Sequence, residues 1–106
     1  MTARRPVVLR DAARRDVDGA ISHYLREGAS EAASSFVEKL EDTVDRIAAH
    51  PEAGSPRYAH ELSLPGLRFS PITGFPHLIF YVVREEVIDV WRVLHGERDI
   101  PAWMRE

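Results

Sequence analysis

The residues of this sequence that are best suited to chemistry are arginines and histidines in its second half. Cleavage of RNA by attack of a 2′-hydroxyl group needs a base, an acid and cationic groups that stabilise the charged transition state. His95 could serve as the acid or the base, because imidazole titrates near neutral pH. Arg68, Arg92 and Arg98 could supply positive charge, and His60 is a further candidate. These residues define one hypothesis, an RNA-cleaving site.

The same side chains also have a structural interpretation, which is the simpler one for each residue taken singly. Arg92 would be a polar position in a half-exposed strand, and His95 would end that strand. Arg98 would pair with Asp99 or Glu97 at the surface. The overall charge also argues against a nucleic-acid partner, because the formal net charge is −3 and affinity for phosphate backbones comes mainly from positive charge.

Metal and membrane chemistry are not expected from this sequence. None of His50, His60, His77 and His95 has a histidine three or four residues away, and the chain has no cysteine. That composition disfavours a metal site, excludes disulfides and fits a reducing cytoplasm. The longest apolar run, residues 78–83, is far shorter than the roughly 20 residues of a membrane-spanning helix. We therefore expect a cytoplasmic protein with no cofactor.

The elements that must position these side chains begin with a short strand and a helix. Residues 7–9 are apolar and mostly β-branched, which predicts the strand. Apolar residues then recur at three- and four-residue spacing, which predicts a helix over about residues 11–27. Asp11 occupies the expected N-cap position, and Gly28 is the expected left-handed end of the helix.

A second helix is predicted over about residues 31–49, where the same spacing of apolar residues returns. Ser30 is its expected cap, and Pro51 ends it. Because the link to the first helix has only two to four residues, the two helices must form an antiparallel hairpin.

The remainder of the chain predicts a loop and three strands. Prolines and glycines break every periodicity over residues 51–66, which indicates a loop. Residues 67–70, 77–83 and 87–94 read as strands joined by short turns, and therefore as an antiparallel meander. The expected fold is a single α+β domain over residues 1–106. In it the helical hairpin packs on one sheet face and the first strand joins an edge.

Two consequences of this arrangement bear on function. Arg68 and Arg92 would lie on neighbouring strands and could share a sheet face, with His95 beyond the strand end. The central strands are apolar on both faces, so the face away from the hairpin also needs a cover. A segment of a partner protein could supply it, or the loop at 51–66 and the C-terminal tail with Trp103 could fold over it.

Four segments resemble the ParE-type toxins of the RelE/ParE superfamily, in the same order and spacing. They are AAHPEAG at residues 48–54, LPGLR at 64–68, HLIFY at 77–81 and VWRVLHGERDI at 90–100. The last is the most specific, because it is similar to the segment that ends the family's domain. Together they span nearly the whole chain.

The resemblance implies the toxin half of a type II toxin–antitoxin pair, neutralised by a ParD-like antitoxin. ParE members inhibit DNA gyrase, whereas their RelE-like relatives share the fold and cut messenger RNA on the ribosome. A third alternative is an inactive homologue that persists only in a repressor complex with its antitoxin.

The residues favour gyrase inhibition by binding over RNA cleavage. RelE-like enzymes cluster lysines and arginines on the sheet and place a tyrosine or histidine near the C-terminus. Here the only lysine is Lys39, outside the sheet, and Tyr24 and Tyr81 fall at expected core positions. Trp103 stands near the place of the C-terminal tyrosine, and an indole cannot perform acid–base chemistry.

The resemblance and the expected exposure together suggest a set of contact residues. The predicted contacts to target or antitoxin are Arg68, Tyr81, Trp91, Arg92, His95, Arg98 and Trp103. If the chain were a nuclease, the candidate catalytic residues would be Arg68, Arg92, His95 and Arg98.

Overall fold

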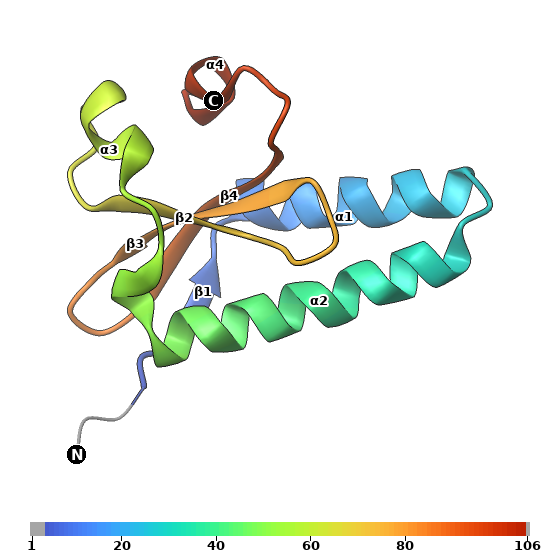
Figure 1. The fold of residues 1–106 in the computed structure, drawn as a ribbon, viewed down its shortest axis with the longest axis horizontal. Helices are drawn as coiled ribbons and strands as arrows, with labels where there is room; N and C mark the ends of the chain where they lie inside the picture. The colour runs from blue at the N-terminus through green and yellow to red at the C-terminus, as the bar shows by residue number, and fades with distance from the viewer. Residues whose placement is uncertain (1–3, 106) are drawn as a thin grey trace.

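The computed structural model describes residues 4–105, which form a four-stranded sheet with helices on both faces (Figure 1). Strands β2 (Leu67–Pro71), β3 (His77–Val83) and β4 (Ile88–His95) form the predicted antiparallel meander. Strand β1 (Val7–Leu9) pairs parallel to β4, which makes the strand order β1-β4-β3-β2. The α+β class and the edge position of the first strand are therefore confirmed.

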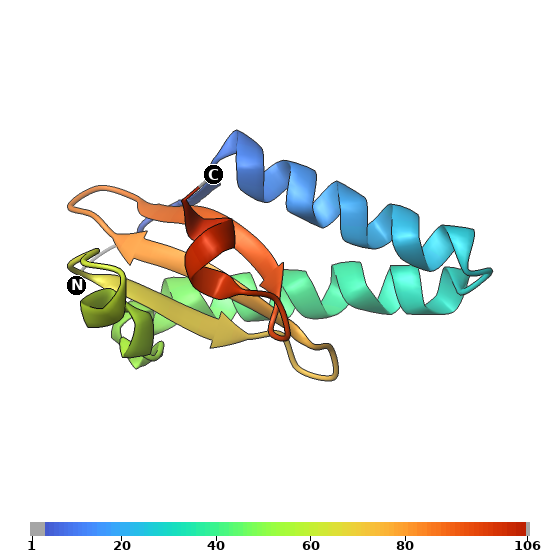
Figure 2. The ribbon, with the colours of Figure 1, turned by 90° about the horizontal axis from the view of Figure 1, so that it is seen from above.

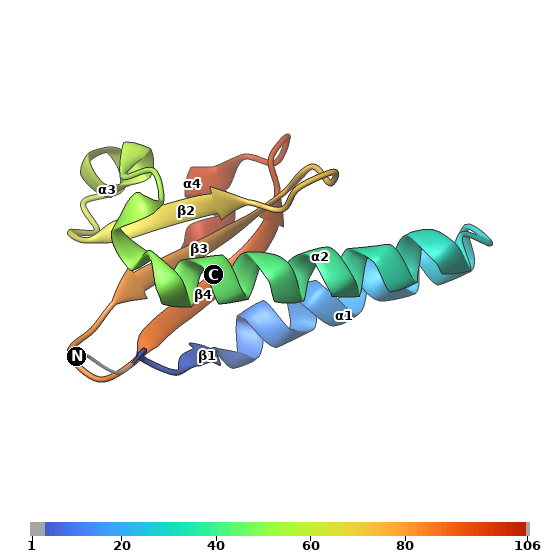
Figure 3. The ribbon, with the colours of Figure 1, turned by 60° about the horizontal axis from the view of Figure 1, so that its bottom comes forward.

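Helices α1 (Asp11–Arg26) and α2 (Ser30–Ala49) form the expected hairpin along one face of the sheet (Figure 3). Gly28 ends α1 with a φ of +71°, as predicted. The N–H of Gly28 donates to the Leu25 carbonyl at 3.1 Å, and that of Ala29 donates to the Tyr24 carbonyl at 2.8 Å. These paired bonds are the Schellman ending that a left-handed glycine permits. The buried core beneath the hairpin includes Phe36, Ile47, Ile79, Tyr81, Val90 and Val93.

The predicted helix caps are wrong by one residue. The N-cap residues are Arg10 and Ala29, and neither makes a side-chain cap bond. Arg10 still donates its N–H to the Val90 carbonyl at 2.9 Å, so the chain passes directly from the β1–β4 ladder into α1. Asp11 therefore lies in the first turn of α1, where its charge favours the positive end of the helix dipole. Ala29 belongs to the ending of α1, and α2 starts at once with Ser30.

The expectation of a plain loop at 51–66 is also wrong. The segment contains a 3₁₀ turn, η1 (Pro51–Ala53), and a short helix, α3 (Arg57–Glu61). A last helix, α4 (Ile100–Met104), follows the sheet. Helices this short span little more than one turn, so hydrophobic periodicity cannot reveal them.

Helices α3 and α4 lie on the sheet face opposite the hairpin, and Figure 2 looks onto that face. There Phe80, Val82 and Leu94 pack with Ile100 and Met104 and with residues of the α3 segment. The chain thus covers both faces of its central strands. The second sheet face is therefore covered by the 51–66 segment and the C-terminal tail, the second of the two alternatives expected from the sequence. No helix within residues 4–105 is long and apolar enough to cross a membrane.

Candidate functional site

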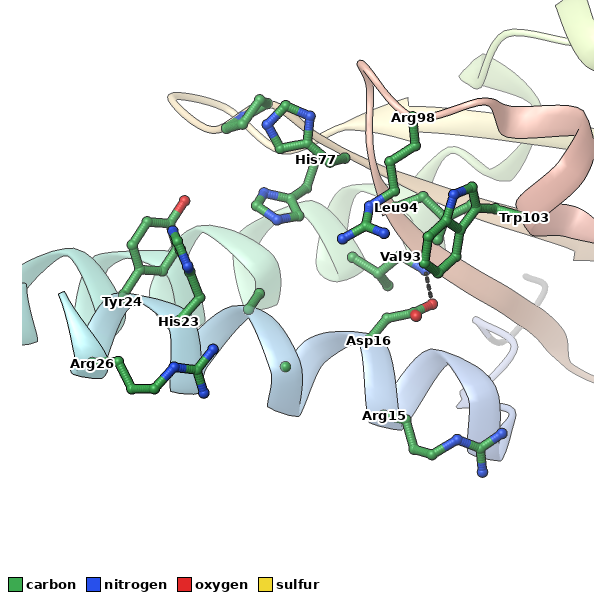
Figure 4. A pocket seen from close by; sticks show the side chains of 14 residues that line it. Arg15, Asp16, His23, Tyr24, Arg26, His77, Val93, Leu94, Arg98 and Trp103 are labelled. Atoms are coloured by element: carbon green, nitrogen blue, oxygen red, sulfur yellow. Dashed lines mark hydrogen bonds between the residues drawn. The ribbon is translucent and has the colours of Figure 1, made fainter. Parts of the chain in front are cut away.

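The densest group of chemically capable side chains lines a cleft where α1 passes the ends of β3 and β4 (Figure 4). Its volume is about 570 Å³, which lies within the usual range for ligand pockets. Arg98 and Trp103 border it on one side, and His23, Tyr24 and Arg26 of α1 border it on the other. The charged and imidazole side chains of its lining are Arg15, Asp16, His23, Arg26, His77, His95 and Arg98.

His77 forms the inner wall of this cleft. Its ring packs edge-on against Phe36, with centroids 4.9 Å apart, and against His95 at 5.5 Å. Its Nδ1 atom is buried and has no hydrogen-bond partner within residues 4–105. The pKa of His77 is lowered from 6.5 to about 4, mainly by burial and further by the positive potentials of His95, Arg98 and His23. His77 is therefore neutral at pH 7.

His95 and Arg98 meet at the rim of the cleft. The Nδ1 atom of His95 accepts a hydrogen bond from the Glu97 N–H at 3.1 Å, so the other ring nitrogen is left to carry a proton. The guanidinium of Arg98 stacks over the Trp103 ring at 4.0 Å. The predicted ion pair of Arg98 with Glu97 or Asp99 is absent from the salt bridges of residues 4–105. Arg98 instead keeps its charge at the mouth of the cleft.

Arg92 is a buried structural residue and not the half-exposed position expected from the sequence. It is 7 % exposed. Its Nε and Nη2 atoms each donate to the Asp16 carboxylate at 2.7 Å, and Nη1 donates to the Trp103 carbonyl at 2.7 Å. The Asp16 carboxylate also accepts the Val93 N–H at 2.9 Å.

The cause of this network is the shortness of β1. Its pairing with β4 stops at Val90, so the outer edge of β4 beyond that residue needs other partners. A shift in the β3–β4 register leaves Trp91 without a paired residue, and Arg92 follows it. Asp16 of α1 accepts the Val93 N–H and so takes the place that a longer β1 would have at this edge. Arg92 joins β4 to α1 and α4 together.

Arg68 and Tyr81 hold the segment that follows α2. Arg68 Nη1 donates to the carbonyls of Glu52 at 2.9 Å and Gly54 at 2.7 Å, and the Tyr81 hydroxyl donates to the Pro51 carbonyl at 2.8 Å. A Cβ atom at Gly54 would overlap the Tyr81 hydroxyl. Tyr81 is fully buried, and burial raises the pKa of its hydroxyl. The sequence-based expectation of Tyr81 as a core residue is confirmed.

Arg68 and Arg92 are not on neighbouring strands, and that prediction is wrong. Strand β3 separates β2 from β4, as the meander order requires. Arg68 pairs with Tyr81 in the ladder, whereas Arg92 pairs with Phe80. Consecutive residues of β3 point to opposite faces, so the two arginines do not converge.

Trp91 belongs to a separate surface cluster at the β1 edge. Its indole N–H donates to the Asp89 carboxylate at 3.0 Å, and Arg10 stacks over its ring at 4.3 Å. Arg10 and Arg84 form ion pairs with Asp89 at 2.9 and 3.0 Å. Burial acts to raise the pKa of Asp89, but the hydrogen bonds from Arg10, Arg84 and Trp91 outweigh it and hold the pKa below its ordinary value.

Of the predicted contact residues, the structure gathers His95, Arg98 and Trp103 at one cleft and leaves the rest elsewhere. His60 lies on α3, outside the cleft. Sequence reasoning missed His23 and Asp16, and it considered His77 only as a metal ligand. In the described part of the chain, no three His, Asp or Glu side chains gather as a metal site would need.

Comparison with known families gives the decisive observation. The family model described as "ParE toxin of type II toxin-antitoxin system, parDE" matches residues 7–100. The chain belongs to this ParE toxin family. A solved structure described as "Chromosomal ParDE TA system from P. aeruginosa" has a similar fold, with a TM-score of 0.71 at 22 % identity, covering 86 % of this chain and 95 % of that chain. No curated protein sequence matches this chain significantly.

Membership of the ParE family gives the resembling segments a physical meaning. In this ParE-family chain, Pro51 and Gly54 present carbonyls to Tyr81 and Arg68. The conspicuous arginine of the last segment, Arg92, ties three elements together. Much of the motif therefore maintains the fold, whereas His95 and Arg98 of its last segment line the cleft.

Proposed function

We propose that this chain is the toxin of a ParDE-type pair, that it acts in the cytoplasm by binding DNA gyrase, and that a ParD-like antitoxin neutralises it. The observation that carries the proposal is the family match over residues 7–100. The geometry is consistent with action by binding, because Arg68 and Arg92 are engaged with carbonyls and a carboxylate inside the fold.

RNA cleavage is the second candidate, and the cleft is the observation that favours it. His77, His95 and Arg98 lie within one concave site. Against it, a histidine with a pKa of about 4 is a weak general base at neutral pH. Arg68 and Arg92, two of the four candidate catalytic residues, also lie outside the cleft and bond to groups inside the fold. They could not contact a transition state bound in the cleft.

The test is to induce this chain alone in bacteria and to follow growth, plasmid supercoiling and the integrity of messenger RNA together. Growth arrest with relaxed or cleaved plasmid and intact messenger RNA supports gyrase as the target. Arrest with site-specific cuts in ribosome-bound messenger RNA and normal supercoiling would replace it with the nuclease. Unimpaired growth would indicate an inactive homologue retained in a repressor complex. Co-expression of a ParD-like antitoxin should restore growth in the first two cases.

A further inference from the structure

We infer that the cleft between α1 and the β4–α4 segment binds carboxylate side chains of an acidic segment in a protein partner. The inference rests on the proposed function only in taking the ligand to be a protein.

The first support is charge that the fold leaves unbalanced. Arg15, Arg26 and Arg98 line the cleft and are exposed, and none takes part in the salt bridges of residues 4–105. The one lining carboxylate, Asp16, is already engaged by Arg92 and the Val93 N–H. Arg15 and Arg26 lie eleven residues apart along α1 (Figure 4), so different carboxylates of one acidic segment would meet Arg98 and the arginines of α1. Charge-assisted hydrogen bonds of this kind are the stronger ones.

The second support is the inner wall. His77 forms this wall with its Nδ1 atom buried, so the imidazole groups open to a ligand are those of His95 and the exposed His23. The charged and titratable groups that face His77 are His95 and Arg98 beyond β4, and His23 and Asp16 on α1. The net positive potential here disfavours a further cation and favours an anion. The ring N–H of His95 is a donor for such a carboxylate, because the Nδ1 atom of His95 already accepts the Glu97 N–H.

The third support separates an acidic peptide from a nucleic acid. The cleft gathers Arg15, Arg26 and Arg98 in a chain whose net charge is −3, so no continuous basic surface is implied around it. Glu97 and Asp99 flank Arg98, and Glu27 follows Arg26. An extended phosphate backbone would run past these carboxylates and be repelled, whereas a single acidic side chain can enter between them. The walls formed by Tyr24, Leu94 and Trp103 suit the apolar part of a peptide side chain.

The experiment uses the full isotope-labelled chain and follows the imidazole signals of His77 and His95 and the indole signal of Trp103 by NMR at pH 7 and low salt. The probes are a capped hexaglutamate peptide, a capped hexaglutamine peptide, the oligonucleotide dT6 and inorganic phosphate. We expect hexaglutamate to shift the three signals and hexaglutamine to leave them unchanged. Arg26→Gln and Arg98→Gln, which lie on different elements, should each weaken hexaglutamate binding about five- to tenfold.

The matched control is Arg57→Gln, which removes the same charge from an exposed position on α3, outside the cleft, and should change binding less than twofold. Thermal melts should show that all three variants keep the fold. No response to hexaglutamate, an equal response to hexaglutamine, equal weakening by Arg57→Gln, or tighter binding of dT6 or phosphate would each overturn the inference. Gyrase assays give an independent result. If hexaglutamate does not bind in the cleft but the chain still inhibits gyrase, this inference is refuted and the proposed function is not.

Discussion

Replacing Asp16 with alanine should remove a large part of this protein's stability, because the substitution takes the carboxylate away from the buried guanidinium of Arg92. Arg92 is 7 % exposed and loses two hydrogen bonds of 2.7 Å. The Val93 N–H also loses its acceptor at the edge of β4. Removing one partner of a buried ion pair costs about 3–5 kcal/mol. The total free energy of unfolding of a domain of this size is only about 5–15 kcal/mol.

Urea unfolding followed by circular dichroism measures this loss as a fall in the transition midpoint. The control is Asp18→Ala, which removes the same charge from an exposed position two residues later in α1. It should change the free energy of unfolding by less than about 0.5 kcal/mol. A loss below about 1 kcal/mol for Asp16→Ala, or equal losses for the two variants, would refute the assignment of Arg92 as a structural tie.

Three further predictions concern the packing around the cleft and the segment after α2. His77 has a pKa of about 4 in the fold against 6.5 when unfolded, so the unfolded chain takes up the proton first and stability falls as pH drops through this window. The full shift would correspond to about 3 kcal/mol, and solvent screening of this part-buried ring reduces it to about 1–2 kcal/mol. Urea unfolding at pH 7 and at pH 4 measures this loss of unfolding free energy, and the loss should be smaller in His77→Gln. Gly54→Ala should lower the free energy of unfolding by about 1–3 kcal/mol in thermal melts, because the new Cβ overlaps the Tyr81 hydroxyl. The loss should be clearly smaller in a Tyr81→Phe background, and an equal loss in both backgrounds would contradict this explanation. Arg68→Met should cost about 1–3 kcal/mol in urea, since it leaves the Glu52 and Gly54 carbonyls without their donor, and a neutral result would show that η1 is held by other contacts.

The long elements were predictable because each carries a repeated signal. The apolar stripes of α1 and α2 recur over several turns, and the break at Gly28 follows from backbone geometry alone. The central strands are apolar on both faces and are bounded by turn residues. The meander order then follows from the short connections.

The short helices were missed because they span little more than one turn. One signal for α4 was nevertheless present, since Asp99 is followed by Pro101 and its side chain accepts the Ala102 N–H at 3.3 Å. An aspartate N-cap with proline in the first turn is a common helix start. No comparable side-chain cap marks α3.

The site was harder to predict because its residues come from distant parts of the sequence. Asp16 and Arg92 are 76 positions apart, and no local pattern shows that they form a pair. His23, His77 and His95 likewise come from α1, β3 and the end of β4. Residue type alone identified His95 and Arg98 as candidates, but it could not separate the exposed Arg98 from the buried Arg92.

The most direct test of the central proposal is a supercoiling assay with purified gyrase, relaxed plasmid and this chain, with and without a ParD-like antitoxin. We predict loss of supercoiling or accumulation of cleaved plasmid, and recovery when the antitoxin is added in excess. Full supercoiling at a large molar excess of folded toxin would contradict gyrase as the target, whatever the fold and family of the chain.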